Sequence, residues 1–195
     1  MSQQRLKVAV IIGSVRKGRF AETITGWFRE QIAQRDDIEA ELIDLADPLI
    51  VEELKLNFDE TAAPMNGPGF AHRIGEADAF VIITPEYNHG YPASLKLAVD
   101  WVYEEWRAKP VAFISYGGMA GGQRAVEQLR QVFAELHAVT VRNTVSFHMA
   151  WEQFDEDGKP LQADAVNKAA DELLDQLTWW GVALKEARAK RAYTA

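Results

Sequence analysis

Short apolar runs alternate with segments of helical periodicity along the whole sequence, and this alternation limits the fold more than any other feature. Val8 to Ile12 is apolar and largely β-branched without a polar break, which is typical of a central parallel strand covered on both faces. From Phe20 to Ile32 apolar residues recur at helical spacing and predict one buried stripe. The first unit of the chain is therefore predicted to be a strand followed by a helix.

The same alternation continues to the end of the chain. Residues 38–45 alternate apolar and acidic side chains and predict a strand near the sheet edge, whereas residues 46–69, rich in Pro and Gly, predict an irregular surface excursion. Further strands are expected at 79–84, 111–115 and 139–145, and further helices at 95–106, 125–136 and 164–190. Five strands with intervening helices predict an α/β fold with an open parallel sheet, in a single domain of residues 1–195.

Composition excludes several classes of function. Lys and Arg total 21 against 29 Asp and Glu, a net charge of −8, so we expect no nucleic-acid partner. The absence of Cys excludes disulfides and Cys-ligated metal sites. The apolar run before Gly13 is too short for a secretion signal, and no stretch has the length of a membrane span. We expect a cytoplasmic protein with no membrane partner.

The loops that follow the first, third and fourth strands are the expected place of function, because ligands of open parallel sheets bind outside the carboxyl ends of the strands. The first loop, Gly13 to Arg19, places Ser14 and three cations, Arg16, Lys17 and Arg19, before a helix. A helix N-terminus repels cations unless an anion lies between them, so the loop indicates a phosphate site. A solvated basic loop is the alternative. The spacing matches neither a dinucleotide fingerprint nor a Walker A loop.

The second loop, Pro85 to Ser94, contains two prolines and two tyrosines. Prolines stiffen a loop, and a tyrosine at its apex can offer a flat face to a planar ligand. An ordinary turn in which Tyr87 covers the end of the sheet is the alternative.

The third loop, Ser115 to Gly122, has four glycines in eight residues, which allow a backbone to approach a ligand closely. Arg124 follows at the start of the next helix. Its guanidinium suits a ligand as well as it suits a surface salt bridge with a Glu.

These loops together resemble the NADPH-dependent FMN reductases of flavodoxin-like fold, a family that includes quinone, azo-dye and chromate reductases. The resemblance runs from about Lys7 to Asn143. Its matching blocks are Gly13-Ser14-x-Arg16-Lys17-Gly18, Pro85-Glu86-Tyr87-Asn88 with Pro92-x-Ser94-Leu95-Lys96 and Asp100-Trp101, and Gly121-Gly122-x-Arg124-Ala125. The resemblance implies the strand order 2-1-3-4-5 and FMN and NADPH as cofactors. It also implies a small-molecule acceptor: free flavin, a quinone, an azo compound or a metal oxyanion.

The resemblance also implies which residues hold FMN. The phosphate is expected at Ser14, Arg16 and the backbone amides through Phe20, with Arg19 standing where the family often has a small hydroxyl residue. The isoalloxazine ring is expected on Pro85, Glu86, Tyr87 and Asn88, and Ser115, Tyr116, Gly117 and Gly118 are expected at its far side. Leu97 replaces a frequent Asn. No catalytic side chain is expected, because the cofactor performs the hydride chemistry.

Other functions are less well supported by the sequence. The four histidines show no metal-ligand spacing, so no metal is expected, and a hydrolase is disfavoured because Gly-x-Ser-x-Gly is missing. Two alternatives remain open: a flavodoxin-type electron carrier that does not itself oxidise NADPH, and an FMN-sensing module without turnover.

The helix after the second loop predicts self-association. Its buried stripe includes Leu95, Val99 and Trp106, yet Leu97 and Trp101 lie on nearly the opposite side. A helix with two apolar sides needs two covers, so a homodimer or homotetramer is expected. The alternative is that Trp101 packs beneath the chain's own residues 46–69.

Overall fold

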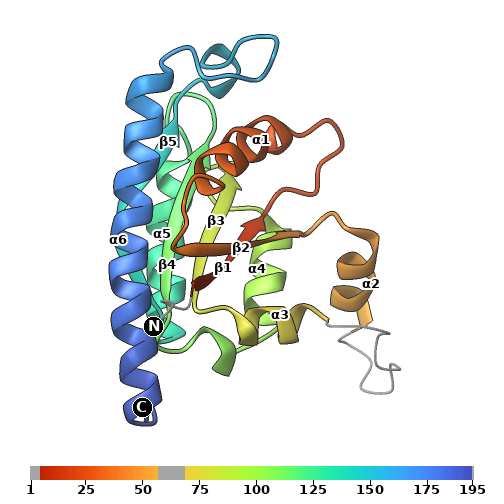
Figure 1. Cartoon of the computed structure of the whole chain (residues 1–195). Coiled ribbons are helices and arrows are strands. Elements are labelled where there is room, and N and C mark those ends of the chain that lie inside the picture. The colour runs from red at the N-terminus through yellow and green to blue at the C-terminus, as the bar shows by residue number, and fades with distance from the viewer. Residues whose placement is uncertain (1–4, 57–68, 195) are drawn as a thin grey trace.

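The computed structural model describes residues 5–56 and 69–194 and shows one parallel sheet with helices on both faces (Figure 1). The order β2-β1-β3-β4-β5 confirms the predicted topology and places the acidic strand at an edge. The strands are β1 (Leu6–Ile12), β2 (Ile38–Asp44), β3 (Ala79–Pro85), β4 (Pro110–Tyr116) and β5 (Val139–Phe147).

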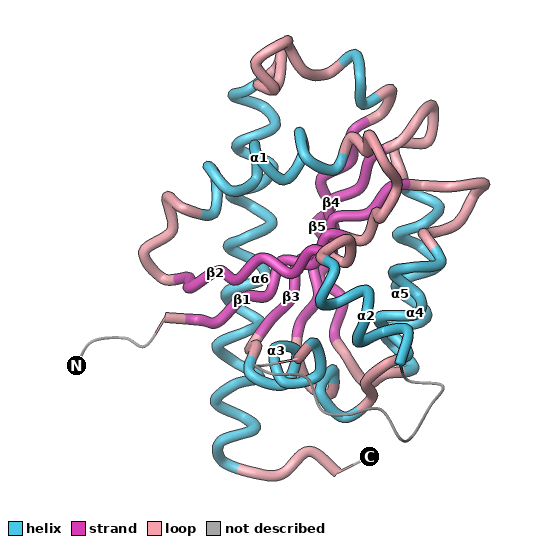
Figure 2. Tube along the Cα trace, turned by 90° about the vertical axis from the view of Figure 1, so that its right-hand side faces the viewer, coloured by secondary structure: helices cyan, strands magenta, loops and turns pink. Residues whose placement is uncertain are grey.

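Alternate residues of β1 enter two separate cores. Val8, Val10 and Ile12 face α1 (Ala21–Ile32) and α6 (Ala163–Lys190), whereas Ala9 and Ile11 face the remaining helices. Figure 2 shows the strands crossing between these two helical layers. The second layer consists of α2 (Pro48–Leu56), α3 (Phe70–Glu76), α4 (Ala93–Asp100) and α5 (Gln123–Glu135). Among the described helices, none has the length and apolar character that crossing a membrane requires.

The predicted excursion at residues 46–69 is wrong for its first part, which forms α2. Asp47 Oδ1 accepts the Leu49 amide at 2.9 Å, and Pro48 occupies the first helical position, where its missing N–H costs nothing. Ile50 and Leu54, one turn apart, are buried against the sheet. The Asp-Pro pair, followed by two apolar residues spaced i, i+4, indicates this helix from the sequence alone. Residues 57–68 of the predicted excursion lie outside the described part of the chain.

The helix predicted for 95–106 is too long, because α4 ends at Asp100. A separate 3-10 turn, Glu104–Trp106, brings Trp106 back into the core, where its indole donates to the Val99 carbonyl at 3.0 Å. The short helix α3 was not predicted from the sequence.

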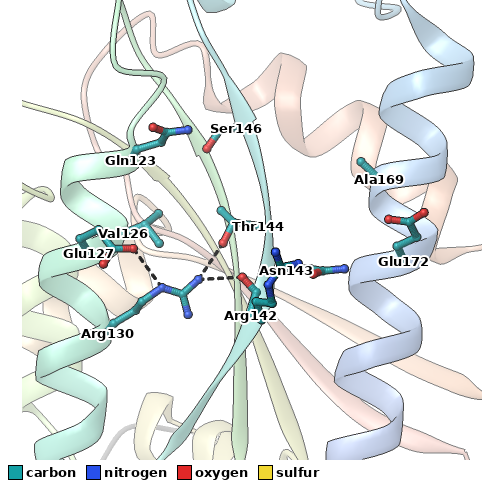
Figure 3. Close-up of a pocket in the computed structure, with 10 residues that line it drawn as sticks. All are labelled: Gln123, Val126, Glu127, Arg130, Arg142, Asn143, Thr144, Ser146, Ala169 and Glu172. Carbon is teal, nitrogen blue, oxygen red and sulfur yellow. Dashed lines mark hydrogen bonds and ion pairs between the residues drawn. The ribbon is translucent and has the colours of Figure 1, made fainter.

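Strand β5 contains an irregularity at the open edge of the sheet. Thr140 pairs with Val111 and Thr144 with Phe113, so three residues, 141–143, stand opposite Ala112 alone. Arg130 of α5 donates to the carbonyl of Val141 at 2.7 Å and to that of Arg142 at 3.1 Å, and Figure 3 draws the second of these bonds. Gln176 of α6 accepts the Asn143 amide at 2.9 Å. Side chains from both flanking helices therefore satisfy the backbone of the bulge.

Candidate functional site

The three predicted loops lie at the same edge of the sheet, because they follow the carboxyl ends of β1, β3 and β4, which are parallel. Gly13 joins the first two loops: its amide donates to the Ile83 carbonyl at 2.9 Å, and its carbonyl accepts the Ser94 hydroxyl at 2.7 Å. A Cβ on Gly13 would lie 3.2 Å from Leu95 Cδ2 and 3.3 Å from the Ile83 carbonyl oxygen. The glycine thus permits the close approach of the first loop to the start of α4.

Ser14 and Tyr87 link the first loop to the second. Ser14 is fully buried, and its Oγ lies 2.8 Å from Tyr87 Oη, close enough for either hydroxyl to donate. The guanidinium of Arg16 lies over the Tyr87 ring, 5.0 Å from the centroid. The predicted phosphate residues Ser14 and Arg16 therefore meet the predicted ring residue Tyr87.

The side chain of Arg19 is largely buried between Asp44 and the first loop. It forms a two-pronged ion pair with Asp44 at the end of β2 and also donates to the Ser14 carbonyl. The hydrogen bonds to Asp44 raise the pKa of Arg19 above its usual value. Arg19 thus braces the first loop against β2, and a direct contact with phosphate stays a prediction. Asp44 was not singled out in the sequence.

The end of the first loop fits an anionic group. Within the described residues, no backbone amide from Ser14 to Gly18 donates to another protein atom, and neither Arg16 nor Lys17 forms an ion pair. Helix α1 begins directly afterwards with no side-chain cap at Phe20. Free amides, two unpaired cations and a helix N-terminus are the donors that a phosphate binds. With the Tyr87 ring beside them, these residues fit the two ends of FMN.

The second loop contains a tight turn. Tyr87 and Gly90 pair in antiparallel fashion, and Asn88 and His89 between them both have positive φ, +50° and +71°. Pro85 is buried at the end of β3, Glu86 is mostly covered, and Asn88 is exposed. Of the predicted ring residues, Asn88 is thus the most exposed, and Tyr87 is partly exposed.

The predicted residues of the third loop divide into two that are buried and two that are partly accessible. Ser115 and Tyr116 are buried in β4, where Ser115 Oγ donates to the Gly121 carbonyl at 2.8 Å. Burial raises the pKa of Tyr116 well above its usual value. Gly117 and Gly118 are half-buried. Contact of these four residues with a flavin ring stays a prediction, and for the first two the side chains point into the protein.

The partner of Arg124 and the neighbour of the third loop were not identified from the sequence. Arg124 forms the salt bridge that was one of its two alternatives, and its partner is Glu86, 2.6 Å from Nε to Oε1. The neighbour is Trp151, which is 57% exposed beside the third loop, since a Cβ on Gly118 would lie 3.7 Å from its ring. Trp151 follows β5, and nothing in its local sequence indicates this neighbour.

A groove of about 550 Å³ lies elsewhere, between α5, β5 and α6 (Figure 3). Its polar walls include Arg130, Arg142 and Glu172, and of these Arg130 donates to the carbonyls of the β5 bulge. Within residues 5–56 and 69–194, no group of three His, Asp or Glu side chains is arranged to hold a metal ion.

Comparison with known proteins supports the sequence resemblance. An NAD(P)H-dependent FMN reductase of Schizosaccharomyces pombe is 40% identical over 136 residues, which are 65% of this chain and 64% of that protein. An NADPH:quinone oxidoreductase of Arabidopsis thaliana is 34% identical over 174 residues, 84% of this chain and 85% of that one. The chain therefore spans less than two thirds of the fission-yeast relative and most of the plant relative.

Solved structures share the fold. The flavoenzyme FerB, an NAD(P)H:acceptor oxidoreductase of Paracoccus denitrificans, has a TM-score of 0.65 and 24% identity, and the match covers 88% of this chain and 97% of that one. Flavodoxin 1 of Bacillus cereus has a TM-score of 0.55 and 16% identity over 88% of this chain and 99% of the other. The predicted flavodoxin-like fold is thereby confirmed.

The family model of NADPH-dependent FMN reductases matches residues 6–152, the part of the chain that contains all three loops. Its description names FMN and NADPH, the two cofactors that the sequence resemblance led us to expect. The chain belongs to the NADPH-dependent FMN reductase family.

Proposed function

We propose that this chain is a flavin oxidoreductase that holds FMN at the carboxyl edge of its sheet and transfers reducing equivalents from NADPH to a small acceptor. The observation that carries the proposal is the meeting of Ser14, Arg16 and Tyr87 beside the unpaired amides of the first loop. The acceptor class comprises free flavins, quinones, azo compounds and metal oxyanions. The whole chain is proposed to act as one FMN-binding domain in the cytoplasm.

The residues divide into two parts by chemistry. The amides from Ser14 onward, with Arg16 and Lys17, neutralise and orient the FMN phosphate, because charge-assisted hydrogen bonds are short and directional. Tyr87 and the backbone at Asn88 support the isoalloxazine, while the Ser14–Tyr87 hydrogen bond fixes the distance between the two parts. Bound FMN supplies the chemistry of accepting and donating a hydride; the protein supplies position and electrostatics.

Self-association is proposed through α4. Leu97 is 37% exposed and Tyr103, just beyond the helix, is 43% exposed, whereas Trp101 packs partly against the chain's own core. A homodimer or homotetramer that covers Leu97 would lie next to the second loop, because α4 begins at Ala93, within the last residues of that loop.

Steady-state oxidation of NADPH by the FMN-loaded protein tests the proposed activity. We expect rapid oxidation of NADPH when a quinone or free flavin is added. With dissolved oxygen as the sole acceptor, we expect NADPH to be oxidised slowly. The untreated apo-protein is the control. FMN that binds but never accelerates NADPH oxidation would favour the flavodoxin-type carrier instead.

A further inference from the structure

The turn from Tyr87 to Gly90 is held in a conformation that its sequence does not favour. Tyr87 donates to the Gly90 carbonyl at 2.8 Å, and Gly90 donates back to the Tyr87 carbonyl at 3.0 Å. The two residues between them have positive φ, as in the tight turns of β-hairpins, where Asn-Gly is preferred. Asn88 suits its place, but His89 stands where glycine is the favoured residue. His tolerates positive φ better than most residues but less well than glycine, so contacts from elsewhere in the protein would stabilise this turn.

The stabilising contacts come from the first turns of α5. Arg124 Nη1 lies 2.8 Å from His89 Nε2, and Gln128 Nε2 donates to the His89 carbonyl at 2.9 Å. Both the side chain and the backbone of the strained residue are therefore held by one helix. Gly90 leaves room for this contact, because a Cβ there would lie 3.3 Å from Gln128 Oε1.

Glu86 joins the same helix to the other end of the turn. Its side chain is only 7% exposed and forms an ion pair with Arg124. Its second carboxylate oxygen accepts the Arg124 backbone amide at 3.2 Å. Because the N-cap of α5 is Gly122, which has no side chain, Glu86 takes over the role of an N-cap from another segment. Glu86 is therefore satisfied by α5 and has few contacts left for a ligand.

We propose that Arg124 and Gln128 act together with Glu86 as a clamp that holds the Tyr87–Gly90 turn in the shape that receives the flavin ring. These three are positioning residues: they act through Tyr87 and Asn88 and do not touch the cofactor. The inference rests on the proposed function, and it assigns to Glu86 a role different from the ring contact expected from the sequence. A clamp of this kind raises FMN affinity by ordering the turn before binding.

Affinity for FMN, titrated on the apo-protein, tests the clamp. Arg124→Ala and Gln128→Ala are each expected to raise the Kd for FMN by about tenfold, the scale of the backbone strain that they leave uncompensated. Gln131→Ala is the matched control, because Gln131 is exposed on the same helix and its side chain has no hydrogen bond to another described residue. We expect its Kd to equal that of the wild type.

A second substitution separates positioning from direct contact. Glycine adopts positive φ freely, so His89→Gly is expected to restore the Kd of the Arg124→Ala variant to within about threefold of the wild type. If FMN binding stays weak in the double variant, Arg124 contacts the ligand itself and the clamp is wrong. Unchanged affinity in both Arg124→Ala and Gln128→Ala would also overturn it.

Hydrogen exchange of the apo-protein keeps this inference separate from the proposed function. The amides of Tyr87 and Gly90 are expected to exchange about tenfold faster in Gln128→Ala or Arg124→Ala, while β3 amides stay protected. Equal exchange in variant and wild type would overturn the clamp whether or not FMN binds. A wild type that takes up no FMN, yet shows the faster exchange in the variants, would overturn only the proposed function.

Discussion

Single side chains at the carboxyl edge of the sheet brace the loops that are proposed to hold FMN. Ser14 and Arg19 were both predicted to contact phosphate, yet Arg19 uses its donors on Asp44 and on the Ser14 carbonyl. Arg16, five residues before the start of α1, has no ion pair in the described structure and lies over the Tyr87 ring. The sequence predicts which residues are near the site, but it does not show which cation Asp44 engages, since that depends on where β2 ends.

Arg16→Ala is expected to weaken FMN binding by about 1.5 to 3 kcal/mol, the range of a charge-assisted hydrogen bond. Titration with FMN and with riboflavin, which lacks the phosphate, measures the effect. Arg29→Ala, which removes an exposed cation near the other end of α1, serves as the charge-matched control. An equal loss for FMN and riboflavin would show that Arg16 does not contact the phosphate.

Lys109 provides a residue-scale test of the structure that does not involve the site. It is buried, its ammonium donates to the carbonyls of Ile74 and Gly75 at 3.0 and 2.8 Å, and burial lowers its pKa to about 8. The folded protein therefore releases this proton at lower pH than the unfolded chain, whose lysine keeps its ordinary pKa near 10.5. Stability therefore rises with pH between about 8 and 10.5, and the contribution of this group is constant below pH 8, where both states hold the proton.

Urea unfolding at pH 7.5 and 10 should show this rise. Relative to Lys109→Met, which cannot titrate, the wild type should gain about 2 to 3 kcal/mol of unfolding free energy across the window. A difference between the two proteins that stays constant with pH would contradict the assigned burial of the ammonium.

At the scale of elements, strands and long helices were predictable and their irregularities were not. Buried runs such as Val8 to Ile12 identify the sheet, because a strand covered on both faces must be apolar throughout. The β5 bulge left no such signal. Its backbone is satisfied by Arg130 and Gln176, which come from two other helices and become neighbours only in the folded chain.

Arg130→Ala is expected to lower the unfolding free energy by about 1 to 2 kcal/mol, since it leaves the carbonyls of Val141 and Arg142 without their donor. It also frees two carbonyls on the open β5 edge, so aggregation on heating should increase. Arg142→Ala is the control: this side chain is exposed on the same bulge and should change stability by less than about 0.5 kcal/mol. Equal stability of the two variants would show that Arg130 does not support the edge.

At the scale of the whole molecule, an unpaired apolar feature remains on α4. Leu97 is exposed on the helix that follows the second loop, and a closed symmetric contact would cover it in both copies. Trp101, which the sequence placed on the same outer side, is partly packed within its own chain, because α4 ends at Asp100 and the backbone turns away.

Leu97→Glu should dissociate the assembly, because it buries an unpaired charge at the seam. Light scattering should show two or four times the 21.9 kDa chain mass for the wild type and a smaller mass for the variant. Leu49→Glu, at a 66% exposed position on α2, is the control. Trp101→Glu should also dissociate the assembly, but it disturbs the core as well. A monomeric wild type, or an unchanged mass in Leu97→Glu, would contradict the interface.

The central claim is that the carboxyl edge of the sheet binds FMN and that NADPH reduces it there. The most direct measurement is the absorption spectrum of the protein mixed with FMN, freed of unbound flavin and then treated with NADPH without oxygen. The account predicts a yellow protein whose flavin band is lost on adding NADPH and returns when a quinone is added. A protein that remains colourless after incubation with FMN would contradict it.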